Sequence, residues 1–231
     1  MRKTYLIVLL IFMLCSQVFA QGRRLQAEVF KIPRYKSGLA TNTFSGIGIY
    51  GRTGNVCLSS SNGIWCEIPY RNGKFNFMSS FIVPTPGFKL AAVASGSDDL
   101  YVFDSLSNSI QAGKSEYKLS KRINKVSGMT YHKNKIYIAN SNNNKIYELQ
   151  LSSGKADFSR TINAHSDIRG LASDGRSLYS CDSNTIYEYG PNMEISSSYK
   201  LNVSIDGIVV TRPNEFLAIA KSKNEIYRFK K

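Results

Sequence analysis

The sequence predicts an all-β protein in which one structural unit is repeated five times, and three observations support this. An Asn stands two residues before an Ile five times, each time after a short apolar stretch: Asn62, Asn108, Asn144, Asn184 and Asn224. Subtracting these positions gives spacings of 46, 36, 40 and 40 residues. The flanking segments are rich in β-branched and aromatic residues, which suit a pleated, half-buried surface. A period of about 40 to 45 residues with short strands is typical of a β-propeller with one blade per repeat.

Residues 1–20 are predicted to be a signal peptide. Arg2 and Lys3 precede a short apolar core, and Ala20 is the small residue after which cleavage is expected. The alternative, an uncleaved membrane anchor, would need a longer apolar run to cross a bilayer. Segment 21–231 then has 231 − 20 = 211 residues, enough for one domain with a sizeable core. We therefore expect a single β-propeller domain over 21–231 that is secreted, or periplasmic in a Gram-negative bacterium.

Each repeat is expected to contribute four strands. The first opens on a small residue, usually a Gly, as at Gly46, Gly128, Gly170 and Gly207. Small residues suit strands that crowd around a central axis. The second and third strands form the hairpin around the repeated Asn, and the fourth follows them, for example at 75–78 and 198–201.

The last repeat ends at Lys231, directly after its third strand. The segment Leu25 to Ile32 lies before the first repeat and has the pattern of a strand. Pairing it with Glu225 to Phe229 would close a five-bladed ring and cover exposed strand edges. The alternative is an open β-solenoid or a flat meander, which would leave two apolar faces unprotected.

The first hairpin contains two cysteines that suggest a disulfide. With Ser61-Asn62 as a two-residue turn, Cys57 faces Cys66 at a non-hydrogen-bonded pair, where side chains lie closest. An exported protein can keep such a bond, which contributes about 2 to 3 kcal/mol for so short a loop. With Asn62-Gly63 as the turn, Cys57 would face Ile68 instead and the bridge would be lost. Cys181 is left over and is expected to be a buried thiol.

One stretch brings a family resemblance. Residues 136–147, Ile-Tyr-Ile-Ala-Asn-Ser-Asn-Asn-Asn-Lys-Ile-Tyr, resemble the core of the NHL repeat, and 178–186 look like a looser copy. The resemblance implies a propeller, and NHL-type propellers commonly have six blades and bind proteins, RNA or other ligands. The same hairpin occurs in gluconolactonase-type propellers, so the resemblance is specific for the fold rather than for the function.

The gluconolactonase resemblance directs attention to the channel mouth, because metal ligands in that family include residues that immediately precede the Gly of the inner strand. The matching positions here are Ser45, Ala91, Ser127, Arg169 and Asp206. Only Asp206 matches such a ligand, and one carboxylate is a poor site for a hard cation that takes six or more oxygens. We therefore expect an ion pair between Arg169 and Asp206 at the mouth, with no metal and no cofactor.

The remaining polar residues give no catalytic set. His132 and His165 fall in predicted loops without metal-ligand spacing and are expected to be exposed. Asp104, Asn140 and Asp182 recur at one hairpin position, where such side chains cap turns through nearby backbone groups. The chain has no Gly-x-Ser-x-Gly nucleophile elbow. No catalytic residue is predicted, which favours a non-enzymatic protein.

Positive charge is the stronger functional lead, since 30 Lys and Arg residues oppose 16 Asp and Glu residues. If the chain ends share a blade, a first cluster gathers there, which we name the basic blade: Arg23, Arg24, Lys31, Arg34, Lys221, Lys223, Arg228 and Lys230. The second cluster comprises Lys118, Lys121, Arg122 and Lys125, continued by Lys133 and Lys135. Such patches raise the local concentration of anionic partners.

The expected function is therefore that of a binding propeller for an anionic polysaccharide, a glycan or an acidic protein surface. The alternative is a divergent lactonase or esterase-like hydrolase with a site around Asp206 and Arg169. A surface adhesin is a third possibility. No motif of a known nucleic-acid reader is present, so nucleic acid is not the expected partner. Asn202 begins the one clear glycosylation sequon, which applies only in a eukaryote.

Overall fold

The computed structural model describes residues 23–32, 44–50, 53–60, 64–79, 81–84, 90–95, 99–220 and 223–231. The predicted signal peptide lies outside these residues, as do Arg34 and Lys221 of the basic blade. The described part is all-β apart from one short 3-10 helix, η2 (Phe77–Ser79). Among these residues no helix has the length and apolar character needed to cross a membrane.

Most strands fall into consecutive groups of four that pair antiparallel in chain order. The first three groups are β3 (Phe44–Tyr50), β4 (Asn55–Ser60), β5 (Ile64–Ile68) and β8 (Phe81–Pro84); β9 (Leu90–Ser95), β10 (Leu100–Asp104), β11 (Ser109–Ala112) and β12 (Ser115–Leu119); and β13 (Val126–His132), β14 (Lys135–Asn140), β15 (Lys145–Ser152) and β16 (Lys155–Asn163). The other two are β17 (Gly170–Ser173), β18 (Leu178–Cys181), β19 (Thr185–Tyr189) and β20 (Ile195–Leu201); and β21 (Gly207–Arg212), β22 (Glu215–Ala220) and β23 (Glu225–Lys230), to which β2 (Glu28–Lys31) adds the fourth strand.

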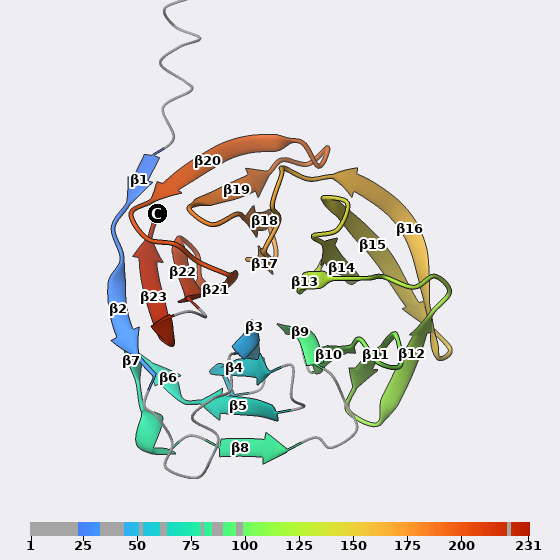
Figure 1. The fold of residues 1–231 in the computed structure, drawn as a ribbon, viewed down its shortest axis with the longest axis horizontal. Helices are drawn as coiled ribbons and strands as arrows, with labels where there is room; N and C mark the ends of the chain where they lie inside the picture. The colour runs from blue at the N-terminus through green and yellow to red at the C-terminus, as the bar shows by residue number, and fades with distance from the viewer. Residues whose placement is uncertain are drawn as a thin grey trace, which may run out of the picture.

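The groups are arranged around a common centre, with their first strands innermost (Figure 1). Each innermost strand contacts the next, from β3 to β9, β13, β17 and β21, and β21 contacts β3. At their outer edges β12 and β16 pair in parallel, with Lys118 opposite Lys155, which joins two groups into one eight-stranded sheet. The architecture is propeller-like, as the repeat predicted.

Glycine is required where the innermost strands approach one another. A Cβ atom built on Gly128 would lie 2.6 Å from the backbone nitrogen of Leu171. A Cβ atom on Gly170 would lie 2.9 Å from the Cα atom of Gly207. Real Cβ atoms do not approach backbone this closely, so the prediction that small residues crowd around the axis is confirmed.

The hydrophobic core lies between the faces of neighbouring groups. Between the last two groups, for example, Tyr179 packs edge-on against Phe216, with ring centroids 5.0 Å apart. Ile186 and Phe229 are fully buried in the same cluster. Burial of each large apolar side chain contributes about 1.5 to 3 kcal/mol, so stacking between sheets supplies most of the driving force for this fold.

The two described N-terminal strands belong to different sheets. β2 pairs antiparallel with β23, with Glu28 opposite Arg228 and Lys31 opposite Glu225. β1 (Arg23–Leu25) instead pairs in parallel with β20, and Arg23 lies opposite Tyr199. The N-terminal segment therefore bridges the fourth and fifth groups (Figure 1).

The expected fourth strand at 75–78 is wrong. β8 is the strand that pairs with β5, and the residues before it form the small hairpin of β6 (Tyr70–Arg71) and β7 (Lys74–Phe75), followed by η2. Phe75 lies in an aromatic cluster, with its ring 5.0 Å from Phe30 and 5.3 Å from Phe77. The aromatic residues that suggested a strand thus anchor an inserted hairpin, which we call the first-group insertion (residues 69–79).

The expected register of the first hairpin is also wrong. Cys57 is paired with Glu67, and Leu58 is paired with Cys66. Ser60 and Ile64 end the pairing, so three residues connect the strands rather than the two that either predicted turn required. Successive residues alternate between the faces of a sheet. This register therefore does not favour the predicted Cys57–Cys66 disulfide. Cys181 is a free, fully buried thiol, as expected.

Candidate functional site

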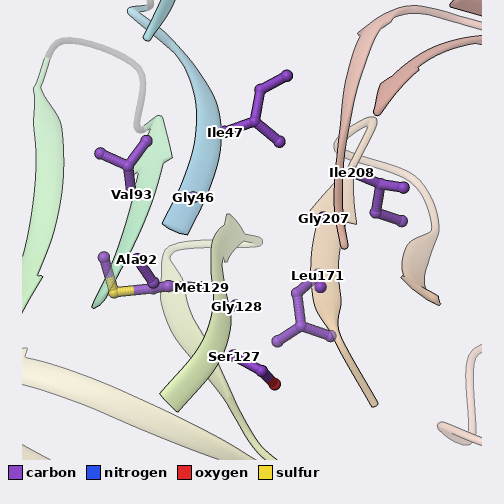
Figure 2. A pocket seen from close by; sticks show the side chains of 11 residues that line it. Gly46, Ile47, Ala92, Val93, Ser127, Gly128, Met129, Leu171, Gly207 and Ile208 are labelled. Atoms are coloured by element: carbon purple, nitrogen blue, oxygen red, sulfur yellow. The ribbon is translucent and has the colours of Figure 1, made fainter. Parts of the chain in front are cut away.

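The central axis is filled rather than hollow. The cavity between the innermost strands has a volume of about 10 Å³, and Figure 2 shows Ile47, Met129, Leu171 and Ile208 around it. A space of this size holds at most about one water molecule. Any ligand must therefore bind at an end of the axis or on the outer surface.

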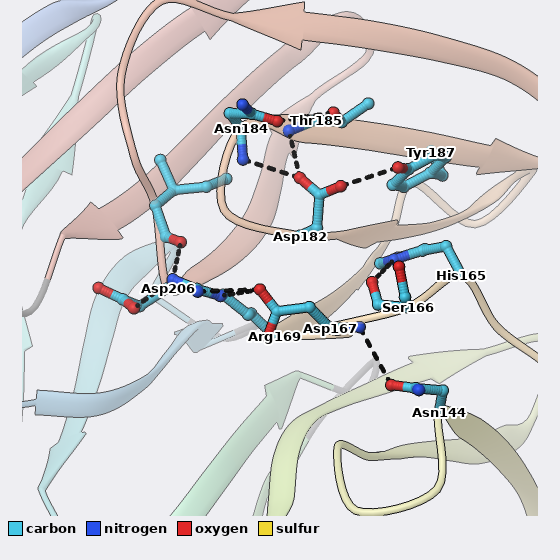
Figure 3. Close-up of polar contacts among 11 residues, drawn as sticks. Asn144, His165, Ser166, Asp167, Arg169, Asp182, Asn184, Thr185, Tyr187 and Asp206 are labelled. Carbon is cyan, nitrogen blue, oxygen red and sulfur yellow. Dashed lines mark hydrogen bonds and ion pairs between the residues drawn. The ribbon is translucent and has the colours of Figure 1, made fainter.

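We call the end at which the innermost strands begin the mouth, and it holds the predicted pair of Arg169 and Asp206. Arg169 Nη1 donates to Asp206 Oδ1 at 3.2 Å, so the expected ion pair is confirmed. Arg169 Nε also donates to Asp167 Oδ2 at 2.9 Å (Figure 3). Partial burial lowers the pKa of Arg169, but the two carboxylates outweigh it and raise that pKa overall. The guanidinium is held between two aspartates and is neutralised by them.

The recurrent hairpin residues cap turns as predicted. Asp182 Oδ1 accepts from the backbone nitrogens of Asn184 and Thr185, each at 2.7 Å, and Oδ2 accepts from the Tyr187 hydroxyl at 2.8 Å (Figure 3). Burial raises the pKa of Asp182, but these donors outweigh it and lower the pKa overall. Asp104 and Asn140 accept backbone N–H bonds at the equivalent positions. These polar groups serve the turns.

The expectation that both histidines are exposed is wrong. His132 is 1% exposed within β13, and its Nδ1 lies 2.7 Å from Ser173 Oγ. His165 is half-buried and stacks on Tyr187, with ring centroids 4.0 Å apart. Burial lowers the pKa of both histidines. Strand alternation turns His132 into the core, and an aromatic partner covers His165.

His165 makes two contacts that fix its tautomer. Its Nδ1 lies 2.8 Å from the carbonyl oxygen of Ser166, so Nδ1 carries the proton and donates. Nε2 then accepts from Ser180 Oγ at 2.9 Å, and Ser180 Oγ lies 3.1 Å from the Tyr189 hydroxyl. A Ser–His contact of this kind can activate a nucleophile. Ser180 is fully buried, however, so this arrangement orders the core instead.

The described residues contain no group of three or more His, Cys, Asp and Glu side chains that could hold a metal ion. At the mouth, the carboxylates of Asp167 and Asp206 are both bonded to Arg169. A cation would have to displace that guanidinium. The mouth is therefore a polar site whose two carboxylates are bonded to Arg169.

The basic blade is divided in the structure. Arg23 and Arg24 lie beside β20, whereas Lys31, Lys223 and Lys230 belong to the β2–β23 side and are exposed. Arg228 pairs with Glu28, donates to the Gly73 carbonyl oxygen at 2.8 Å and lies over the Phe30 ring. Lys231 pairs with Glu188 at 2.7 Å. Part of the predicted patch thus stabilises the fold.

Most side chains of the second cluster are exposed in the structure. Lys118, Lys121, Arg122 and Lys125 are all exposed, and none forms an ion pair with another described residue. Lys155, which sequence reasoning missed, joins them because β12 and β16 pair in parallel. Lys135 does not belong to the cluster, since it pairs with Glu148.

The arrangement of the sheets around a common axis makes this chain a propeller-fold protein. Two solved structures share the fold. Glutaminyl cyclase from Myxococcus xanthus superposes with a TM-score of 0.64 at 12% identity, over 90% of this chain and 98% of that one. A catalytically inactive virginiamycin B lyase from Staphylococcus aureus, solved with quinupristin, gives a TM-score of 0.52 at 17% identity, over 85% of this chain and 69% of that one.

Comparison by sequence, unlike comparison by structure, finds no similar protein. No family model matches the chain, and no curated protein matches it. The NHL resemblance is therefore supported as far as a propeller-like fold and no further. At 12% and 17% identity the two structures show the fold alone.

Proposed function

We propose that this chain is an exported, non-enzymatic propeller that binds a polyanion, such as an acidic polysaccharide or an acidic protein surface. One observation carries the proposal: Lys118, Lys121, Arg122 and Lys125 are exposed, and none pairs with a carboxylate in the part of the chain that the structure describes. Unpaired surface cations raise the local concentration of an anionic partner. The mouth offers a rival site, but its one guanidinium is already bonded to two aspartates.

The binding surface that we propose consists of Lys118, Lys121, Arg122, Lys125 and Lys155. The strand pairing sets Lys118 directly opposite Lys155, so two like charges occupy neighbouring backbone positions. Such a juxtaposition is unfavourable unless an anion or solvent screens it. Glu116 and Asp157 are the acidic residues of the two strands concerned, and they leave a clear excess of positive charge.

Chromatography on immobilised heparin tests the proposal. We expect retention near physiological salt, and we expect the triple variant Lys118→Gln, Lys121→Gln, Arg122→Gln to elute at clearly lower salt. The matched control is Lys31→Gln, Lys223→Gln, Lys230→Gln, which removes the same charge from the other cluster. Equal shifts would mean that net charge alone decides retention, because unspecific attraction depends on total charge and salt. Passage of the wild-type protein at low salt would refute the proposal.

The finer architecture is part of the proposal. We propose five blades and a ring that the N-terminal segment closes, with β2 as the outer strand of the last blade. The pairing of β2 with β23 and the contact of β21 with β3 support closure. Deletion of 21–32 should then destabilise the whole domain cooperatively. A deletion variant with unchanged urea unfolding would argue for an open meander.

A further inference from the structure

The end of the axis opposite the mouth carries two adjoining depressions, which we call the far-end groove. The first has a volume of about 160 Å³ and is lined mainly by apolar side chains, among them Ile47, Val93 and Leu171. The second has a volume of about 340 Å³ and contains Arg71 and Arg212. The two share Ile49 and Thr211, so they are continuous.

Backbone contacts fix the position of the Arg71 guanidinium in the second depression. Arg71 Nη1 donates to the Tyr70 carbonyl oxygen at 2.8 Å, and Nη2 donates to the Thr53 carbonyl oxygen at 2.5 Å. A guanidinium has five N–H donors, and these two bonds use two of them. Gly54 beside it has φ = 64° and no side chain, which leaves the space over Nη1 open.

Arg212 forms the other charged wall at the end of β21. It is exposed and makes no ion pair within the described part of the chain. Among the described residues that line the two depressions there is no carboxylate. Glu215 is 8% exposed and accepts hydrogen bonds from the hydroxyls of Tyr70 and Thr211, both of which line the second depression. The Glu215 carboxylate is thus already bonded to two hydroxyls of the protein.

We propose that the far-end groove binds a small amphipathic anion: a carboxylate or phosphate head between Arg71 and Arg212, with a short apolar chain along the adjoining depression. Planar guanidinium groups suit carboxylate and phosphate oxygens. Concave apolar surface with a few converging polar groups is the usual form of a ligand pocket. This site is separate from the polyanion surface proposed above and does not depend on it.

Isothermal titration calorimetry with octanoate, octyl phosphate and neutral 1-octanol tests the proposal. We expect octanoate or octyl phosphate to bind the wild-type protein at least tenfold more tightly than octanol. Whichever of these two anions binds more tightly identifies the preferred anionic group as a carboxylate or a phosphate. Propionate should bind more weakly than octanoate, because it cannot reach the apolar depression. The proposal would be overturned if neither octanoate nor octyl phosphate bound more tightly than octanol, or if propionate bound as tightly as octanoate.

The variants Arg71→Gln and Arg212→Gln should each weaken anion binding about tenfold, since each removes one charge-assisted contact. Arg176→Gln is the matched control, because Arg176 is exposed on a turn of the same end and does not line the groove. Unchanged affinity in both groove variants, with circular dichroism showing a folded protein, would refute the assignment. Heparin retention of the same variants should stay as in the wild type, so failure of this site and failure of the polyanion surface are separable.

Discussion

The substitution Glu148→Gln tests whether buried polar networks between strands stabilise the sheets. Glu148 is 5% exposed on β15. Its carboxylate pairs with Lys135 and accepts from the hydroxyls of Tyr137 and Ser159, each at 2.7 Å. Burial raises the pKa of Glu148, but these donors, Lys135 first, outweigh it and lower the pKa from 4.5 to about 2.

The magnitude follows from that shift. Each pK unit corresponds to about 1.4 kcal/mol, so a shift from 4.5 to about 2 gives a ceiling of about 3 kcal/mol. The folded-state pKa is depressed, so this stability is present above pH 4.5 and is lost as the pH falls toward 2. Gln keeps the shape and one acceptor oxygen, and Lys135 is partly solvated. We therefore expect a loss of about 2 kcal/mol at pH 7.

Urea unfolding at several pH values between 7 and 2.5 measures the effect. The free energy of unfolding of the wild type should exceed that of Glu148→Gln at pH 7, and the difference should shrink toward zero at pH 2.5. The control is Glu194→Gln at an exposed position, for which we expect a change within about 0.5 kcal/mol. A pH-independent difference, or none at pH 7, would refute the reasoning.

Three further predictions concern the axis, the buried thiol and the buried imidazole. Gly128→Ala should lower the free energy of unfolding by more than about 3 kcal/mol, because the added Cβ atom would collide with the backbone of the next strand. In the control Gly175→Ala the Cβ atom meets nothing within 4 Å, so the loss should be about 1 kcal/mol, due to the φ of 85°. Urea unfolding of the two variants measures both losses. Burial raises the pKa of Cys181 and hides it, so labelling by Ellman's reagent, followed by mass spectrometry, should reach this residue only on unfolding. The pKa of His132 should lie below 6.5 by NMR titration; protonation then favours the unfolded state, and His132→Gln should reduce the stability lost as the pH falls below 6.5.

The parts of the fold that the sequence predicts well are those with a strict local requirement. Gly128 and Gly170 stand where an added Cβ atom would lie within 3 Å of the neighbouring backbone, so glycine at the start of an innermost strand marks the repeat. The turn-capping role of Asp104 and Asp182 is equally local, since both bond to backbone two or three residues away. Such constraints are visible in a single sequence because the partner is nearby along the chain.

The failures involve partners that are distant in the sequence. Phe75 packs against Phe30, which lies on the N-terminal strand, so its aromatic pattern imitates a strand. A signal for the insertion was present, since the first repeat spacing is 46 residues and the others are 36 to 40. The cysteine register depended on a turn of two residues, and one more residue moves every side chain to the other face. His132 bonds to Ser173 on the neighbouring group, which local loop signals do not encode.

The first-group insertion also makes the two ends of the axis chemically different. At the mouth, both Asp167 and Asp206 pair with Arg169, so the guanidinium is already bonded within the protein. At the opposite end, Arg71 of the insertion and Arg212 line one depression, and none of its described lining residues is a carboxylate. Arg71 lies on the first-group insertion, so one of the two charges at this end comes from residues outside the repeat. Because surface departures from a repeat cost little stability, they are where a scaffold of this kind can acquire a ligand site.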